Sequence, residues 1–142
     1  MIELRYNEDL QPAYMSQHSS GCDLRSKISI EIWPRKIVLV PTSVFISHVE
    51  WEKVPEGFVP EIQIRARSGL ALRHGIGLPN GVGTIDADYR DEISVILTNF
   101  SDMPYTIQQG ERIAQMVLNL VPRFPNLPTL GTRTGGFGST GR

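Results

Sequence analysis

The stretch GTIDADYRDEISVILTNF, residues 83–100, joins a cluster of charged side chains directly to a run of apolar and β-branched ones. Its second half, from residue 93 onward, is typical of a buried β-strand, because β-branched residues pack well on a pleated surface. Its first half carries three aspartates, a glutamate, an arginine and a tyrosine. A turn needs only one Asp or Asn and a Gly. The stretch therefore predicts a core strand with a polar functional site at its N-terminal end.

Runs with strand composition recur along the chain and are separated by turn signals from 13 glycines and 10 prolines. They are MIELRY, KISIEIW, RKIVLVPTSVFIS, FVPEIQIRA, DEISVILTNF, PYTIQ and ERIAQMVLNLVP. One short helix is predicted at residues 68–75, with Ser68 as the N-cap and Gly75 at the end. Many short strands and a single short helix predict an all-β fold, a jelly-roll-like barrel or sandwich.

Length and charge limit the class of protein. A chain of 142 residues has the size of one domain. A net charge of −1 provides no basic field for nucleic acid or an anionic membrane, and no apolar run approaches the ~20 residues of a membrane span. The N-terminus lacks the pattern of a secretory signal, and the single Cys22 permits no intrachain disulfide. We expect a cytoplasmic, or at least intracellular, protein without nucleic-acid or membrane partners.

The C-terminal segment TRTGGFGSTGR, residues 132–142, differs from the β domain expected at residues 1–131. Its composition cannot bury enough apolar surface to order itself, which predicts a mobile arm. One interpretation is a frayed chain end. The other is an arm that closes over a ligand: Phe137 would stack on a flat base, and Ser139, Thr140 and backbone N–H groups would contact phosphate.

Three further stretches contain candidate site residues. In RARSGLALRHG, the arginines and Ser68 at the end of a strand could form an anion site, or Ser68 could be an ordinary N-cap beside solvated arginines. In GERIAQMVL, Gln115 faces outward from a strand, which also fits a plain amphipathic strand. Asp23, in SGCDL, fits turn chemistry; Cys22 beside it has no second Cys or clustered His, which argues against a zinc site.

Asp86 and Tyr89 are the candidates in the opening stretch. A carboxylate held at a strand end can accept a proton from water, and an aromatic ring three residues later can close over a ligand ring. The pair Asn80–Gly81 just before it is a hairpin signal, which indicates a bend in this region. A charged β-turn that leads into a core strand is an equally good interpretation of these residues alone.

Taken in order, SGCDL, RSGLALRHGI, NGVGTIDADYRDE, GERIAQMVL and GGFGSTG resemble the five motifs of the trimeric dUTPases, from Ser20 to Gly141. The resemblance implies a β jelly roll and a homotrimer in which the arm of one subunit closes over a site formed by two others. It implies hydrolysis of dUTP to dUMP and pyrophosphate with Mg²⁺. That reaction limits uracil incorporation into DNA and supplies dUMP for thymidylate synthesis.

The resemblance also implies a role for each matching residue. Asp86 activates the attacking water, and Tyr89 packs under the deoxyribose and leaves no space for a 2′-hydroxyl. Asn80 and the adjoining hairpin backbone read uracil, and Asp23 is linked to the metal through water. The substrate-binding residues that the resemblance implies are Arg67, Ser68, Gly69, Asn80, Gly83, Thr84, Ile85, Tyr89, Gln115, Arg133, Phe137, Gly138, Ser139 and Thr140.

Two departures from the family pattern concern specific backbone positions. Asp91 stands where the third motif usually has glycine, so its backbone must tolerate a side chain. Arg133 lies two residues before Gly135, whereas the family arginine lies three before, where this chain has Thr132. A dCTP deaminase of the same fold and a non-enzymatic binding module are the alternative functions. Asp86 and Phe137 argue against the deaminase, and the intact set of matching residues from Asp23 to Thr140 argues against the binding module.

Overall fold

The structure is a computed structural model in which residues 1–133 and 136–137 are described. It confirms the all-β prediction: two four-stranded sheets and one two-stranded sheet, all with antiparallel pairing. The first sheet has the order β1 (Ile2–Arg5), β4 (Ile37–Val49), β8 (Ile93–Asn99) and β6 (Ile76–Gly77). The second has the order β2 (Cys22–Arg25), β10 (Arg112–Pro122), β5 (Phe58–Ala66) and β7 (Gly83–Asp86). Strands β3 (Ile30–Ile32) and β9 (Tyr105–Ile107) form the third.

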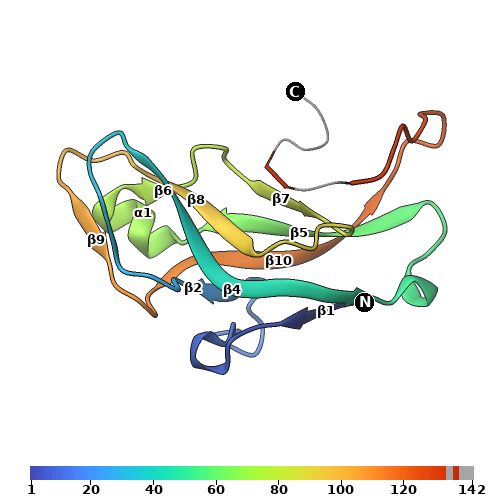
Figure 1. The fold of residues 1–142 in the computed structure, drawn as a ribbon, viewed down its shortest axis with the longest axis horizontal. Helices are drawn as coiled ribbons and strands as arrows, with labels where there is room; N and C mark the ends of the chain where they lie inside the picture. The colour runs from blue at the N-terminus through green and yellow to red at the C-terminus, as the bar shows by residue number, and fades with distance from the viewer. Residues whose placement is uncertain (134–135, 138–142) are drawn as a thin grey trace.

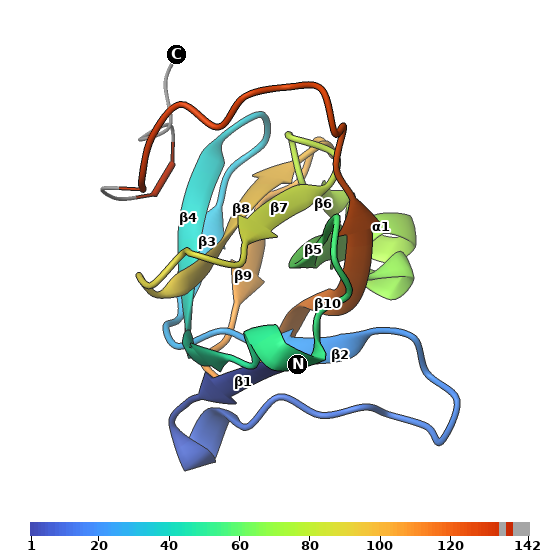
Figure 2. The same cartoon turned by 90° about the vertical axis from the view of Figure 1, so that its right-hand side faces the viewer.

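The two larger sheets pack face to face around one apolar core (Figures 1 and 2). Alternation decides which side chains enter it: Ile93, Val95 and Leu97 of β8 are at most 1% exposed, and Ile62 and Ile64 of β5 face them from the other sheet. The arrangement is a jelly-roll sandwich, and within the described residues it does not close into a barrel.

The predicted short helix is present as α1 (Ser68–His74), and two 3₁₀ turns lie at Glu8–Leu10 and Trp51–Lys53. Gly75 ends α1 in a left-handed conformation with φ of 66°, as predicted from its type. The prediction of Ser68 as N-cap was wrong by one residue. Arg67 is the N-cap and makes no side-chain cap hydrogen bond, because the helix begins one residue earlier than the Ser signal suggested.

The predicted hairpin at Asn80–Gly81 was wrong as well. The turn is formed, with Gly81 N–H donating to the carbonyl of Leu78 at 3.0 Å. However, the strands on its two sides do not pair with each other: β6 pairs with β8, and β7 pairs with β5. The turn therefore carries the chain from one sheet to the other, and its backbone lies at the rim of the sandwich.

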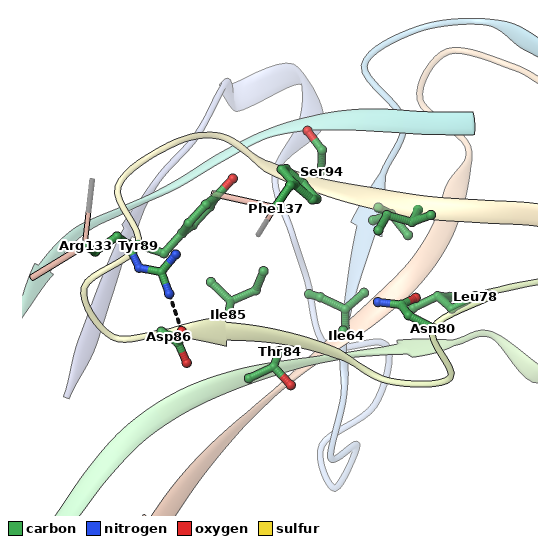
Figure 3. Close-up of a pocket in the computed structure, with 13 residues that line it drawn as sticks. Ile64, Leu78, Asn80, Thr84, Ile85, Asp86, Tyr89, Ser94, Arg133 and Phe137 are labelled. Atoms are coloured by element: carbon green, nitrogen blue, oxygen red, sulfur yellow. Dashed lines mark hydrogen bonds and ion pairs between the residues drawn. The ribbon is translucent and has the colours of Figure 1, made fainter. Parts of the chain in front are cut away.

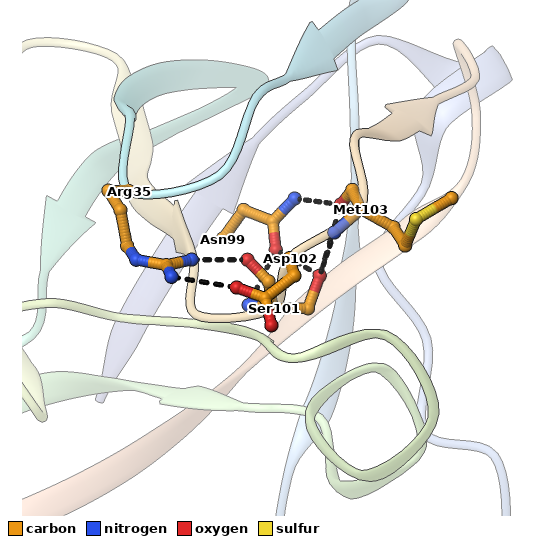
Figure 4. Close-up of polar contacts among 5 residues, drawn as sticks. All are labelled: Arg35, Asn99, Ser101, Asp102 and Met103. Atoms are coloured by element: carbon orange, nitrogen blue, oxygen red, sulfur yellow. Dashed lines mark hydrogen bonds and ion pairs between the residues drawn. The ribbon is translucent and has the colours of Figure 1, made fainter.

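A buried amide, Asn99, fixes the C-terminal end of β8 (Figure 4). The side chain of Asn99 is fully buried and donates to the carbonyls of Ile32 and Met103 at 2.9 and 2.7 Å. Its oxygen accepts from the N–H and the hydroxyl of Ser101. Arg35, with φ of 66°, donates to the carbonyl of the same serine at 2.7 Å. These bonds make the turn after β8 rigid.

No helix among the described residues is long and apolar enough to cross a membrane. Cys22 is buried as a free thiol, and burial raises its pKa.

Candidate active site

Asp86 is the last residue of β7, and its side chain is 52% exposed at the strand end. Strand β7 pairs with β5, which places Ile85 in the core and Asp86 on the outer face of the sheet. The chain then bends, because Tyr89 N–H donates to the Asp86 carbonyl at 3.0 Å. The predicted bend at Asn80–Gly81 is present, and this second bend after Asp86 was not predicted from the sequence.

Tyr89 folds back from this bend and is only 5% exposed. Its hydroxyl donates to the carbonyl of Glu92 at 2.8 Å. Burial, with the nearby carboxylate of Asp91, raises the pKa of the Tyr89 phenol, so the ring stays neutral and remains a donor. Asp91 is not in the left-handed region, so its side chain is accommodated without strain where glycine was expected.

These residues line a cavity of about 200 Å³ between β7 and β8. In Figure 3, Ile64 and Ile85 point into the space between the two strands, Asn80 lies at one end, and Tyr89 and Asp86 lie at the other. Among the predicted residues the cavity contains Asn80, Gly83, Thr84, Ile85, Asp86, Tyr89, Arg133 and Phe137. Sequence reasoning missed Ile64, Leu78, Val95 and Ile96, whose apolar side chains mark them only as strand or core residues, and Ser94, a polar residue within the run of β8.

The C-terminal segment returns to the cavity of its own chain, whereas the arm was predicted to close over a site formed by two other subunits. The Arg133 guanidinium forms ion pairs with Asp86 and with Asp88, the latter at 2.8 Å, and it lies 5.7 Å from the centre of the Tyr89 ring. Phe137 meets Tyr89 edge to face, with ring centres 6.5 Å apart. Arg133, rather than Thr132, is thus the arm residue that reaches the site.

Gly136 brings the arm into close contact with the site. A Cβ atom at this position would lie 2.5 Å from the Tyr89 ring, closer than any real contact allows. A side chain here would push the arm or the ring away. Gly138, Ser139 and Thr140 lie outside the described residues, and so does most of the segment predicted to be mobile.

The remaining predicted residues form a second, separate group. Asp23, Arg67, Ser68, Gly69 and Gln115 line an open groove of about 350 Å³ beside the start of α1. The groove and the cavity share no lining residue. In one chain the structure therefore brings the sequence-predicted residues together as two sites rather than as one.

Ion pairs and hydrogen bonds hold the groove in shape. The Asp23 carboxylate pairs with Arg112 at 3.2 Å and with Arg67 at 3.8 Å. Arg67 also donates to the carbonyl of Arg112, and Gln115 donates to the carbonyl of Ala66. Gly21 is required beside them, because a Cβ there would overlap the Gln115 side-chain oxygen. Arg112 lies three residues before Gln115 in GERIAQMVL and was not predicted as a site residue.

No group of three or more His, Cys, Asp or Glu side chains in residues 1–133 and 136–137 is arranged to hold a metal ion. Asp23 has two cationic partners, Arg67 and Arg112.

Comparisons with known proteins identify the family and the fold. The family model described as dUTPase matches residues 8–141. The crystal structure of dUTPase from Streptococcus mutans is 27% identical with a TM-score of 0.74, covering 87% of this chain and 98% of that chain.

Two staphylococcal phage enzymes are similar in fold. One is an aspartate-to-asparagine mutant dUTPase of S. aureus phage phi11, described with a structural Mg(II) ion. The other is an aspartate-to-asparagine mutant of Staphylococcus bacteriophage 80alpha dUTPase with dUpNHpp. Each shares 21% identity with this chain at a TM-score of 0.69, and the match covers 92% of this chain and 96% of the other.

Proposed function

This chain belongs to the dUTPase family, and we propose that Asp86 is the general base with which it hydrolyses dUTP. The reaction of the family yields dUMP and pyrophosphate, limits incorporation of uracil into DNA and supplies dUMP for thymidylate synthesis. The observation that carries the assignment is the cavity between β7 and β8, where the Asn80 turn, Tyr89 and Asp86 lie along one surface.

The Asp86 carboxylate removes a proton from water as the water oxygen attacks the α-phosphorus. The new oxygen–phosphorus bond forms as the bond to the bridging oxygen breaks, and pyrophosphate leaves with the electron pair of that bond. The exposed position of Asp86 at the strand end supports this role, because water and a phosphate can both reach it.

The rest of the cavity suits a deoxyuridine. The turn at Leu78–Val82 offers backbone donors and acceptors to the edge of uracil, with Asn80 beside them. Ile64 and Ile85 provide an apolar floor for the base and sugar. The buried ring of Tyr89, anchored through its hydroxyl, leaves no space for a 2′-hydroxyl under the sugar.

The arm completes the enclosure. Phe137 stacks on uracil, and Gly138, Ser139 and Thr140 contact the γ-phosphate. Arg133 exchanges its carboxylate partners for phosphate oxygens when dUTP binds, which is supported by its position next to Asp86. Arg–phosphate pairs are favoured because the guanidinium can donate two parallel hydrogen bonds.

Arg67, Ser68, Gly69 and Gln115 bind the triphosphate from a neighbouring subunit of a homotrimer. The separation of the groove and the cavity in one chain, which share no lining residue, supports this arrangement. Asp23 lines the same groove and would hold Mg²⁺ through water. Bound to the phosphates, Mg²⁺ would neutralise part of their charge and favour departure of pyrophosphate.

The test is to measure the products formed from each dNTP, and from UTP, with and without Mg²⁺. We expect pyrophosphate from dUTP alone, and only with the metal. Orthophosphate as the sole product would place attack at the γ-phosphorus and exclude Asp86 as the base for attack at the α-phosphorus. Ammonia released from dCTP would instead support the deaminase.

A further inference from the structure

Tyr89 is held in place by a residue three positions further along the chain. The bond from its hydroxyl to the Glu92 carbonyl, at 2.8 Å, closes residues 89–92 into a compact loop. Glu92 immediately precedes β8, so the position of its carbonyl depends on how the start of that strand is fixed.

The Glu92 carboxylate provides that fixation by reaching across to β4. It accepts a hydrogen bond from the backbone N–H of Ser43 at 2.7 Å, and Lys27 Nζ lies 3.8 Å away. A bond from N–H to a carboxylate is charge-assisted and stronger than a neutral one. The Glu92 side chain is 24% exposed, which lowers the screening by water.

The backbone of β4 is shaped to present this N–H group. Between Pro41 and Val44 the register of β4 with β8 shifts, and Ser43 has φ of 68°, in the left-handed region. Thr42 beside it is fully buried, and its hydroxyl donates to the carbonyl of Ile93 at 2.5 Å. A bulge that is strained at a non-glycine residue persists only where its surroundings require it.

We infer that Glu92 is a positioning residue that sets the selectivity for deoxyribose over ribose, by holding Tyr89 against the sugar through the bulge of β4. The inference depends on the role of Tyr89 proposed above and adds the means by which that ring is kept in place. The Ser43 N–H donates to the Glu92 carboxylate, and the Tyr89 hydroxyl donates to the Glu92 carbonyl.

Loss of the Glu92 carboxylate should lower the selectivity for dUTP over UTP, and not only the stability of the protein. Exclusion of a 2′-hydroxyl is steric, and a shift of the ring by a fraction of the size of a hydroxyl would admit it. Without the carboxylate, the Ser43 N–H loses its partner and residues 89–92 gain freedom to move. The base Asp86 lies before the bend and is held by the pairing of β7 with β5, so hydrolysis itself should continue.

Glu50 offers a matched control. Its carboxylate also joins two chain segments, accepting from the N-terminal ammonium of Met1 at 2.9 Å with Lys53 Nζ at 2.8 Å, and its side chain is 19% exposed. It lines neither the cavity nor the groove. Glu50→Ala therefore removes a comparable anchor without touching the loop of Tyr89.

The experiment measures kcat/KM for dUTP and UTP, with melting temperature, in the full-length protein carrying Glu92→Ala, Glu92→Gln, Glu50→Ala or Tyr89→Ala. We expect Glu92→Ala to lower the dUTP/UTP ratio by about tenfold or more, the scale on which pockets discriminate a single small group. Glu92→Gln, whose amide oxygen can still accept from Ser43, should keep the ratio within about threefold of the parent. Glu50→Ala should keep the ratio while losing stability.

If Glu92→Ala does not fold, Glu92→Asp has the same expected result, since it keeps the charge and withdraws the carboxylate by one methylene. An unchanged ratio in both Glu92→Ala and Glu92→Asp, with a lowered ratio in Tyr89→Ala, would overturn the inference and leave the role of Tyr89 intact. An unchanged ratio in Tyr89→Ala would remove the role of the ring and the inference with it. Equal losses of the ratio in Glu92→Ala and Glu50→Ala would reduce Glu92 to a general stabilising residue.

Discussion

The cavity between β7 and β8 and the groove beside α1 are built by different means. The cavity is formed by two strands and a turn, with apolar side chains at its base and the Tyr89 ring closing one end. The groove is open and is lined mostly by polar and charged groups around the Asp23 ion pairs. An enclosed, partly apolar cavity suits a base and a sugar, whereas an open cationic surface suits phosphates. On the proposed function, each chain would carry both halves of a nucleotide site in two pockets that share no lining residue.

The largest loss of activity is expected from substitution of Asp86, the proposed general base. Asp86→Asn should lower kcat by about 10²–10⁴-fold, since the general base is lost, while dUTP still binds. Pyrophosphate release and calorimetric binding of a non-hydrolysable dUTP analogue measure the two effects. Asp88→Asn is the control, because it removes another carboxylate that pairs with Arg133 but leaves the proposed base in place. We expect kcat to fall only a fewfold in this variant. Equal losses in the two variants would mean that the Arg133 contacts, rather than proton removal, determine the rate.

Removal of residues 132–142 should have the next largest effect. Turnover should fall by about hundredfold, because water exclusion and phosphate positioning are lost. The melting temperature should change by only a few degrees, since Phe137 is 60% exposed and Arg133 pairs with exposed carboxylates. The comparison is between truncated and full-length protein in turnover, melting and light scattering. Full turnover without residues 132–142 would mean that the β-sandwich forms the active site without the arm.

A single methyl group on the arm should have a smaller effect. Gly136→Ala places a Cβ against the Tyr89 ring, so we expect kcat/KM for dUTP to fall by about tenfold as the arm closes less well. Gly131→Ala is the matched control, because a Cβ there meets nothing within 4 Å. If the two variants behave alike, contact between the arm and the cavity in the same chain has no part in catalysis.

Much of the sandwich could be predicted because local alternation determines it. Ile62 and Ile64, and Ile93, Val95 and Leu97, show the period of two that places them in the core. Gly75 could be predicted as the helix end, because few other residues adopt its backbone conformation. Two-residue β6 was missed, because so short a strand depends on its neighbour β8 and not on its own residues.

Site residues that lie close together in the sequence could be predicted. Contacts between residues that only the fold brings together could not. Asp86 and Tyr89 lie close in sequence and meet at one cavity. Glu92 and Ser43 are 49 residues apart, and only the packing of β4 on β8 brings them together. The ion pairs of Arg133 with Asp86 and Asp88 likewise depend on the path of the chain after β10, for which the proline-punctuated segment offers no pattern.

In the proposed trimer the cavity of one subunit works with the groove of another, and mixing two inactive variants shows whether it does. Asp86→Asn damages only the cavity, and Arg67→Met damages only the groove while keeping the apolar stem of the side chain. Each variant alone should have little activity. After the two are unfolded and refolded together in equal amounts, about one quarter of the sites in a symmetric trimer should combine an intact Asp86 with an intact Arg67. We predict dUTP turnover far above the sum of the separate variants. Turnover no greater than that sum, in mixed trimers shown to have formed, would place both groups in the same chain's site and contradict the account.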